Sequence, residues 1–329
     1  MTLPDLLQGL DPAKLRSSPA RMRAGLLAVV SAGADVWNGP LEGLVETLGQ
    51  LARVDMCLAR LVEGHADAVR ICEQAPARRL DGVYGVWASR SVGTGLRAGP
   101  TEAGWRLHGE LRFASGVGLV DRALASAWLD EDRHVLLDID ANGVTADESS
   151  WTTWAMDASR SFTVDVDVDV DSGSQVGGLD FYLSRPGFAV GGLAVAAVWA
   201  GGARHVVDAV TTSVREFSVS PHQQRRVGVM EQAVWTADVA VASTLRVLAA
   251  APPDDVPAEI GRARTAVVLA CDAVLSQAPL VVGPGGLSRD ARLARVLADL
   301  AVYIRQHHLD DELTRLGATA IESHELIGG

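Results

Sequence analysis

Cysteine and net positive charge are both scarce in this 329-residue sequence. Its three cysteines, Cys57, Cys72 and Cys271, are too few and too scattered for a disulfide framework or a zinc cluster, so we expect buried, reduced thiols. Aspartate and glutamate outnumber lysine and arginine by 41 to 29, which gives a formal net charge of −12. Nucleic acids and anionic membranes need a basic surface, so neither is expected as the main partner.

Long apolar runs are also missing from the sequence. The N-terminal string MTLPDLLQGLDPAKLRSS has no basic segment that leads into an apolar run, so no signal peptide is indicated. The apolar stretch at residues 191–203 is shorter than the roughly 20 residues that a membrane-spanning helix needs. These absences predict a cytoplasmic protein without a membrane span.

Several common catalytic motifs do not occur. The sequence contains no Walker loop, HExxH, CxxC or GxSxG. The string nearest to a dinucleotide fingerprint is the Gly-Pro-Gly-Gly that begins at Gly283. It follows a helical pattern instead of a strand, so it predicts a turn between helices and argues against a Rossmann oxidoreductase.

Hydrophobic periodicity divides the chain into three segments, and their order predicts an α+β fold. Residues 1–81 form an N-terminal helical domain, residues 82–190 a middle β-domain, and residues 191–329 a C-terminal helical domain. The first segment has apolar residues every three or four positions, at Leu41, Leu44, Val45, Leu48, Leu51 and Val54. The last has long periodic stretches at 206–217, 227–250, 259–277 and 289–304, which predict a four-helix bundle.

The middle segment alternates apolar and polar residues at 105–110, 123–129 and 134–139. The most regular run is VDVDVDVD at residues 164–171, where alternation places valines on one face of a strand and aspartates on the other. A calcium loop is excluded, because counting from Asp167 places Ser172 at the sixth position and Gly178 at the twelfth, where such loops need Gly and Glu.

The string GWRLHGELRFASG at residues 104–116 resembles a strand pair of the acyl-CoA dehydrogenase family. In that family an aromatic, a small residue and a Ser or Thr face the flavin, so the resemblance implies that Phe113 and Ser115 contact the isoalloxazine ring. Phe-x-Ser-Gly is closer to the flavin monooxygenase branch than to the dehydrogenases, which usually have Trp-x-Thr. Residues 86–89 stand where dehydrogenases carry a Thr-Glu-Pro loop, but that Glu and Pro are absent here.

The C-terminal segment resembles the same family in its spacing. Gly283 begins the family's Gly-rich turn, and Asp299 matches the Asp of its Arg-Asp pair, with Ala298 in place of the Arg. The catalytic Glu of dehydrogenases, eight residues later, then falls on His307. A register that uses Asp290 instead would place Ala298 at the catalytic position, so neither register supplies a carboxylate.

An imidazole at the catalytic position has two chemical uses. It could accept a proton near neutral pH, or it could hydrogen-bond the reactive oxygen of a monooxygenase. Alternatively, His307 and His308 are solvated residues at the end of a helix. The resemblance also places Arg215, Gln224 and Arg225 on the pyrophosphate and adenine of FAD, in many relatives the FAD of a partner subunit; surface salt bridges are the alternative.

Some further residues have simpler interpretations. His65 lies in a helix and is interpreted as a half-buried structural histidine, although a histidine there could reach an active site. Trp151 and Trp154 are expected to cover the core of the β-domain. The N-terminal helical domain is about two helices shorter than the family norm, so an acyl pocket would be open, completed by a partner, or lost.

Three functions remain open at this point. The first is an FAD-dependent oxidoreductase acting on an acyl thioester or a related small molecule, with His307 as its base. The second is a monooxygenase that uses reduced flavin, with FMN as its cofactor. The third is an inactive scaffold subunit that pairs with an active homologue. The resemblance implies a homodimer or homotetramer.

Overall fold

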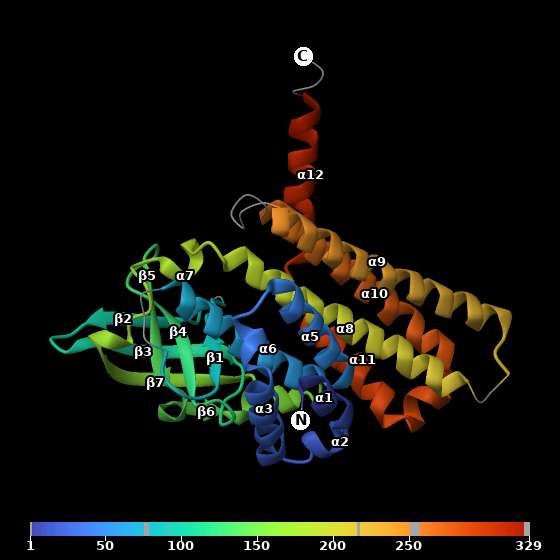
Figure 1. The fold of residues 1–329 in the computed structure, drawn as a ribbon, viewed down its shortest axis with the longest axis horizontal. Helices are drawn as coiled ribbons and strands as arrows, with labels where there is room; N and C mark the ends of the chain where they lie inside the picture. The colour runs from blue at the N-terminus through green and yellow to red at the C-terminus, as the bar shows by residue number, and fades with distance from the viewer. Residues whose placement is uncertain (1, 76–78, 92, 216–217, 251–256, 326–329) are drawn as a thin grey trace. The chain divides into compact units, whose positions relative to one another are not determined.

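The computed structural model describes residues 2–75, 79–91, 93–215, 218–250 and 257–325 (Figure 1). The chain divides into two compact units, residues 1–191 and 192–329. The sheet and the helices that precede it lie in the first unit, and the second unit is helical. The predicted α+β fold is confirmed.

Six helices open the first unit: α1 (Leu3–Gly9), α2 (Pro12–Leu15), α3 (Pro19–Ala32), α4 (Ala34–Trp37), α5 (Leu41–Val54) and α6 (Met56–Gln74). The apolar stripe of α5 is buried as its spacing predicts, at Leu44, Leu48 and Leu51. Asp55 separates α5 from α6, because its extended backbone ends one helix and its carboxylate caps the next, accepting from the backbone N–H of Leu58 at 2.9 Å.

Seven strands form one sheet: β1 (Tyr84–Trp87), β2 (Leu96–Pro100), β3 (Gly104–Ala114), β4 (Arg122–Trp128), β5 (His134–Asp140), β6 (Thr145–Asp147) and β7 (Phe162–Asp171). Strand β4 pairs in parallel with β1 and β2 and antiparallel with β5. Strand β3 pairs antiparallel with β2 and β7, and β6 adds to the outer side of β7.

The predicted alternation fails in β4 and β5. Nearly every residue of both strands is buried, so both faces are covered instead of one. On one face Leu124 and Leu136 pack against Ile71 and Cys72 of α6. An alternating pattern predicts only strands with one buried face. A strand that is buried on both faces has a continuous run of apolar residues instead.

The VDVDVDVD strand is confirmed as β7. Val164 and Val166 are fully buried, whereas the aspartates between the valines are exposed. Arg106, on the facing strand β3, forms ion pairs with Asp167 and Asp169. The aspartates therefore form a solvated strand face.

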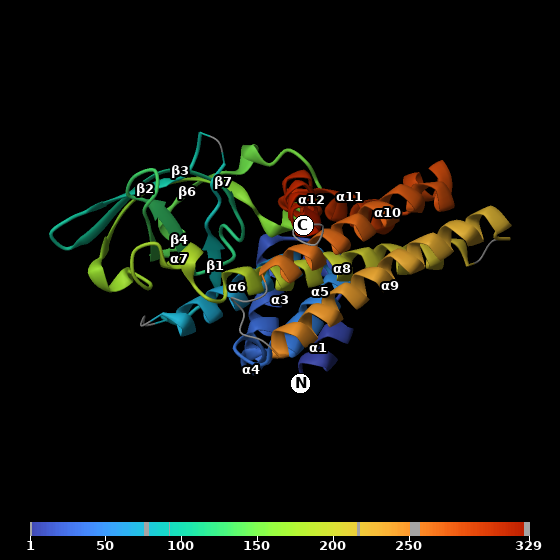
Figure 2. The ribbon, with the colours of Figure 1, turned by 90° about the horizontal axis from the view of Figure 1, so that it is seen from above.

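A short helix, α7 (Phe181–Ser184), follows the sheet, and five helices follow α7: α8 (Phe188–Val214), α9 (Pro221–Ala250), α10 (Pro257–Arg289), α11 (Ala291–Tyr303) and α12 (Leu309–Glu325). Helices α9 and α10 pack against each other and lie side by side in Figure 1, whereas in Figure 2 α8 is seen between them. Helix α8 joins the periodic stretch at 206–217 to the Gly-rich stretch at 191–203, which is also expected to be helical, and it begins at Phe188. Every residue from Leu193 to Ala203 is buried, so this stretch has no polar face and shows no helical periodicity.

The predicted turn at Gly283 is a kink inside α10. Gly283 has φ 66° and ψ −177°, and helical backbone continues on both sides. Pro284 explains the kink, because proline has no N–H to donate and disfavours helical backbone at the residue before it.

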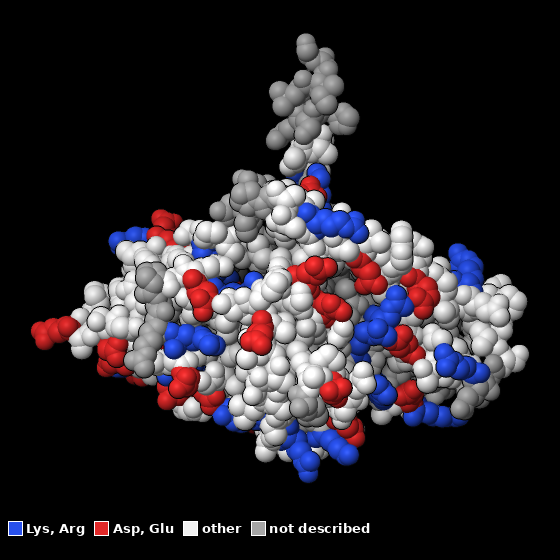
Figure 3. Space-filling view, viewed as in Figure 1, with Lys and Arg blue, Asp and Glu red and all other residues white. Residues whose placement is uncertain are grey.

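Helices α8, α9 and α10 are each long and apolar enough, by length and composition alone, to cross a membrane. The most apolar stretch of each is buried to 72%, 22% and 39%, respectively. The short run at 191–203 is thus part of a 27-residue helix, and length no longer argues against a membrane span. On the face shown in Figure 3, acidic and basic side chains are interspersed.

Candidate functional site

Phe113 occupies a β-bulge in β3, where the register with β7 shifts between Leu111 and Ala114. Its backbone has φ 62°, a left-handed conformation that is strained for a bulky residue. Phe113 is 54% exposed, and its ring contacts Trp151 edge-on, with 6.4 Å between the ring centroids. Strain of this kind is found where a site requires it, so the bulge that presents this ring marks a candidate binding surface.

Ser115, two residues further, belongs to a chain of buried hydroxyls. Its Oγ lies 2.8 Å from the Oγ of Ser161, which in turn lies 2.8 Å from the Oγ of Ser159. The hydroxyl of Ser159 donates to the carbonyl oxygen of Met156 at 2.7 Å. The backbone carbonyl of Ser115 accepts from Trp87 Nε1 at 3.0 Å, which fixes its position.

The two tryptophans predicted to cover the β-domain core differ. The indole N–H of Trp151 donates to the carbonyl oxygen of Ala155 at 2.9 Å, and the side chain is partly buried. Trp154 is exposed, so the prediction is wrong for this residue. Its polar segment between β6 and β7 gives no periodicity from which exposure could be judged.

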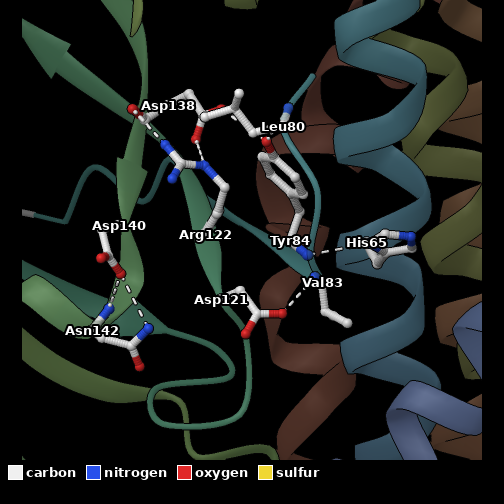
Figure 4. Close-up of polar contacts among 9 residues, drawn as sticks. All are labelled: His65, Leu80, Val83, Tyr84, Asp121, Arg122, Asp138, Asp140 and Asn142. Atoms are coloured by element: carbon white, nitrogen blue, oxygen red, sulfur yellow. Dashed lines mark hydrogen bonds and ion pairs between the residues drawn. The ribbon is translucent and has the colours of Figure 1, made fainter. Parts of the chain in front are cut away.

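A buried polar network joins α6 to the sheet, and sequence reasoning did not foresee it (Figure 4). The hydroxyl of Tyr84 donates to Asp138 Oδ2 at 2.8 Å and accepts from the backbone N–H of Leu80 at 3.0 Å. Arg122 Nε donates to the other carboxylate oxygen of Asp138 at 2.7 Å. His65 Nδ1 accepts from the backbone N–H of Tyr84 at 3.2 Å. These bonds connect α6, β1, β4 and β5.

Burial shifts the acid–base behaviour of this network. Desolvation, with a smaller contribution from the positive charge of Arg79, lowers the pKa of His65 to about 4. Burial raises the pKa of Asp138, against the hydrogen bond from Tyr84 and the charge of Arg122. Burial and Asp138 raise the pKa of Tyr84. His65 is therefore a neutral core histidine, only 2% exposed, and more deeply buried than predicted.

In the second unit, His307 follows the 3₁₀ turn Ile304–Gln306, between α11 and α12. It is 9% exposed, and its Nε2 lies 3.2 Å from the hydroxyl of Thr265 on α10. The indole of Trp199 on α8 lies beside the ring, with 6.0 Å between centroids. His308 is exposed. The alternative that these histidines are solvated residues at a helix end is therefore correct for His308 and wrong for His307.

His307 is held in its neutral form. Burial, followed by the positive charge of Arg264, lowers its pKa, and the negative charge of Glu312 opposes this shift. Glu312 is itself paired with Arg315. A neutral imidazole that contacts one hydroxyl can accept a proton or donate one, depending on its tautomer.

The residues predicted to bind the FAD pyrophosphate lie on the surface of the second unit. Arg215 is exposed just after α8, and Gln224 and Arg225 are exposed near the start of α9. Within the described residues, neither Arg215 nor Arg225 forms an ion pair. The alternative of surface salt bridges is therefore not seen for these two arginines. Their neighbour Arg226 is held by Gln277 on α10 at 2.9 Å.

No protein-family model matches the chain, and no curated protein matches it. Solved structures do. Methanesulfinate monooxygenase MsuC from Pseudomonas fluorescens aligns with a TM-score of 0.80 and 16% identity, covering 98% of this chain and 96% of that chain. Dibenzothiophene monooxygenase TdsC from Paenibacillus sp. A11-2 aligns with a TM-score of 0.78 and 14% identity, covering 96% and 95%. Butyryl-CoA dehydrogenase from Megasphaera elsdenii aligns with a TM-score of 0.79 and 15% identity, covering 97% and 96%.

The chain has the acyl-CoA dehydrogenase fold. The predicted resemblance is confirmed at this level, and the alignments cover almost the whole chain. Within the acyl-CoA dehydrogenase fold, the structure brings the predicted residues together in three groups. Phe113 lies in the bulge of β3 and Ser115 directly follows that strand. Arg215 lies at the end of α8, and Gln224 and Arg225 lie near the start of α9. His307 lies in a buried cluster with Thr265 and Trp199.

Proposed function

We propose that this chain is a flavin-dependent oxidoreductase acting on a small molecule, with His307 in place of the glutamate base of dehydrogenases. The carrying observation is the neutral, buried imidazole of His307 against the hydroxyl of Thr265. FAD, FMN or their reduced forms are the proposed cofactors, and the cytoplasm is the proposed location.

The chemistry of the side chains fits a flavin. The exposed ring of Phe113 offers an aromatic surface for a flat heterocycle, and Ser115 offers a hydroxyl beside it. Arg215, Arg225 and Gln224 offer guanidinium and amide donors suited to a pyrophosphate. A bound flavin would supply two-electron redox chemistry. Among similar structures, TdsC is described with FMN and XiaF from Streptomyces sp. with FADH2.

Burial affects a histidine base and a carboxylate base in opposite directions. It raises the pKa of a carboxyl group and so strengthens the carboxylate as a base, but it lowers the pKa of an imidazole and weakens it. His307 follows this rule. Removing the α-proton of a thioester requires a strong base, so we favour oxygen insertion with reduced flavin, in which neutral His307 donates a hydrogen bond. Dehydrogenation of a thioester is the second candidate, because an unprotonated imidazole can still accept a proton.

The second unit carries apolar side chains that suit self-association. Trp235 on α9 is 59% exposed and Leu280 on α10 is 56% exposed, with Val239 and Leu269 also exposed on these two helices. Exposed apolar surface of this kind is typical of subunit interfaces. We propose a homodimer or homotetramer, with a homologous partner subunit as the alternative. Light scattering that returned a monomer of the 34.6 kDa chain would contradict this.

The decisive experiment is flavin binding followed by two assays. Purified protein is titrated with FAD and with FMN. Each flavin is used in its oxidised form in air and in its reduced form without oxygen. The complex is then tested for anaerobic bleaching by acyl-CoA and for oxygen incorporation into sulfur-containing or aromatic substrates. Bleaching by a thioester would favour the second candidate. If no form of either flavin bound, the chain would be the scaffold subunit and the proposal would be wrong.

A further inference from the structure

Thr265 on α10 uses its hydroxyl differently from other helical threonines of the chain. A threonine hydroxyl in a helix commonly donates to the carbonyl oxygen four residues earlier, and this bond is present, at 2.8 to 3.1 Å, at Thr212, Thr236, Thr314 and Thr319. Thr265 makes no such bond to Gly261. Its hydroxyl oxygen lies 3.2 Å from His307 Nε2, the only hydrogen-bonding contact of this side chain within the described residues.

The hydroxyl proton of Thr265 decides the direction of this hydrogen bond. A hydroxyl and an imidazole nitrogen can each donate or accept, so the distance alone leaves both directions open. Thr265 is only 4% exposed. If a proton on Nε2 pointed at the hydroxyl oxygen, the hydroxyl proton would be buried with no acceptor among the described residues, which is unfavourable. If Nε2 carries no proton, the hydroxyl donates to it and both buried groups are satisfied.

The proton of the neutral ring must then lie on the other nitrogen. A neutral imidazole carries one proton, so an unprotonated Nε2 leaves Nδ1 protonated. Burial and the positive charge of Arg264 lower the pKa of His307 and keep the ring neutral. Nδ1 has no hydrogen-bond partner among the described residues, and it is not one of the buried polar atoms that lack a partner. Nδ1 is therefore the ring nitrogen that a ligand can reach.

We propose that Thr265 is a positioning residue that holds neutral His307 in the Nδ1–H tautomer, so that the ring presents a donor to a bound ligand. The role of the ring in a reaction rests on the proposed function. A protonated Nδ1 has no lone pair with which to take a proton from a ligand, but it can bond an acceptor oxygen. Thr265 thus favours a substrate with an acceptor oxygen over abstraction of a proton from a thioester.

The test records the imidazole ¹⁵N chemical shifts of the full chain, labelled with ¹⁵N-histidine, near neutral pH and without flavin. Protonated and unprotonated ring nitrogens differ widely in shift, so the spectrum reports the tautomer, and the signals missing from His307→Ala belong to His307. We expect wild type to carry its proton on Nδ1.

Variants of the threonine test its part in this preference. Thr265→Val keeps the shape of the side chain without the hydroxyl, and it should lower the ratio of Nδ1–H to Nε2–H about tenfold, the equivalent of one hydrogen bond. Thr265→Ser restores a hydroxyl and should restore the ratio. Thr244→Val, at a buried threonine of α9, is the matched control and should leave the ratio unchanged.

The outcomes separate this inference from the proposed function, because the spectra need no flavin. A wild-type ring protonated on Nε2 would overturn the inference, even in a protein that binds flavin. An unchanged ratio in Thr265→Val would overturn it as well. An Nδ1–H ring in a protein that binds no flavin would support the tautomer and contradict the flavoenzyme. If Thr265→Val does not fold, the wild-type spectrum and that of Thr265→Ser still decide.

Discussion

Each unit buries a neutral histidine, but the two are held differently. His65 in the first unit accepts a backbone N–H, and its neighbours Tyr84, Asp138 and Arg122 are bonded to one another (Figure 4). His307 in the second unit contacts the hydroxyl of Thr265 and lies next to an exposed histidine. A backbone donor fixes the tautomer of His65, whereas a hydroxyl can either donate or accept. Burial alone therefore does not separate a structural histidine from one that can exchange protons.

The largest effect should come from removing the exchangeable histidine. We expect His307→Ala to reduce any activity found by about 10²- to 10⁴-fold, because general acid–base groups contribute that much. Flavin content should change little, but loss of the buried ring beside Trp199 and Thr265 should lower thermal stability, so activity is compared at a temperature at which the variant remains folded. The exposed neighbour offers a matched control, His308→Ala, which should retain activity in the same steady-state assay.

His307→Glu sharpens the same test, because it restores the dehydrogenase carboxylate. Gain of acyl-CoA dehydrogenation would show that the rest of a thioester site is intact. No gain, with flavin still bound, would favour the monooxygenase. Equal loss of activity in His307→Ala and His308→Ala would remove the distinction between the two histidines.

The network around His65 should respond in stability. Asp138→Ala leaves the partly buried Arg122 without its buried partner, which should lower the free energy of unfolding by about 3 kcal/mol. Asp140, exposed at the end of the same strand, is a suitable comparison, and Asp140→Ala should cost less than about 1 kcal/mol. Urea denaturation of both variants measures the difference, and similar losses would show that the network adds nothing special.

Acid should destabilise the first unit through His65. The imidazole titrates at 6.5 in the unfolded chain and at about 4 in the fold. Between these values the unfolded chain binds more protons, so stability is present above pH 6.5 and is lost as the pH falls to 4, by about 3 kcal/mol. His65→Asn keeps an acceptor for Tyr84 but does not titrate. Unfolding of both proteins across this range should show a shallower pH slope in the variant.

The smallest effect is expected on the strand face of β7. Arg106→Ala removes ion pairs to Asp167 and Asp169, all of which are exposed, so stability should fall by less than about 1 kcal/mol. Added salt should diminish even that difference. If Arg106→Ala lowered the free energy of unfolding as much as Asp138→Ala, the exposed ion pairs of Arg106 would be as stabilising as the buried pair of Asp138 and Arg122, contrary to this prediction.

Sequence periodicity predicted the elements whose two faces differ. The stripe of α5 and the valines of β7 are examples, and counting from Gly283 led to His307. Periodicity gave no signal in the Leu193–Ala203 stretch of α8 or in β4, because nearly every residue of these two stretches is buried. It also gave no sign of the left-handed backbone at Phe113. The serine chain was not predictable, because Ser115 and Ser161 are 46 positions apart and meet only through strand pairing.

The outer side of β7 has a consequence for handling the protein. Among the described strands only β6 covers it, at Thr163–Asp165, so the second half of β7 is an open sheet edge. Open edges invite strands from other molecules, and alternating carboxylates discourage this by mutual repulsion. Salt screens the repulsion between exposed carboxylates. Concentrated stocks should therefore precipitate as β-rich aggregates more readily at high ionic strength than at low ionic strength.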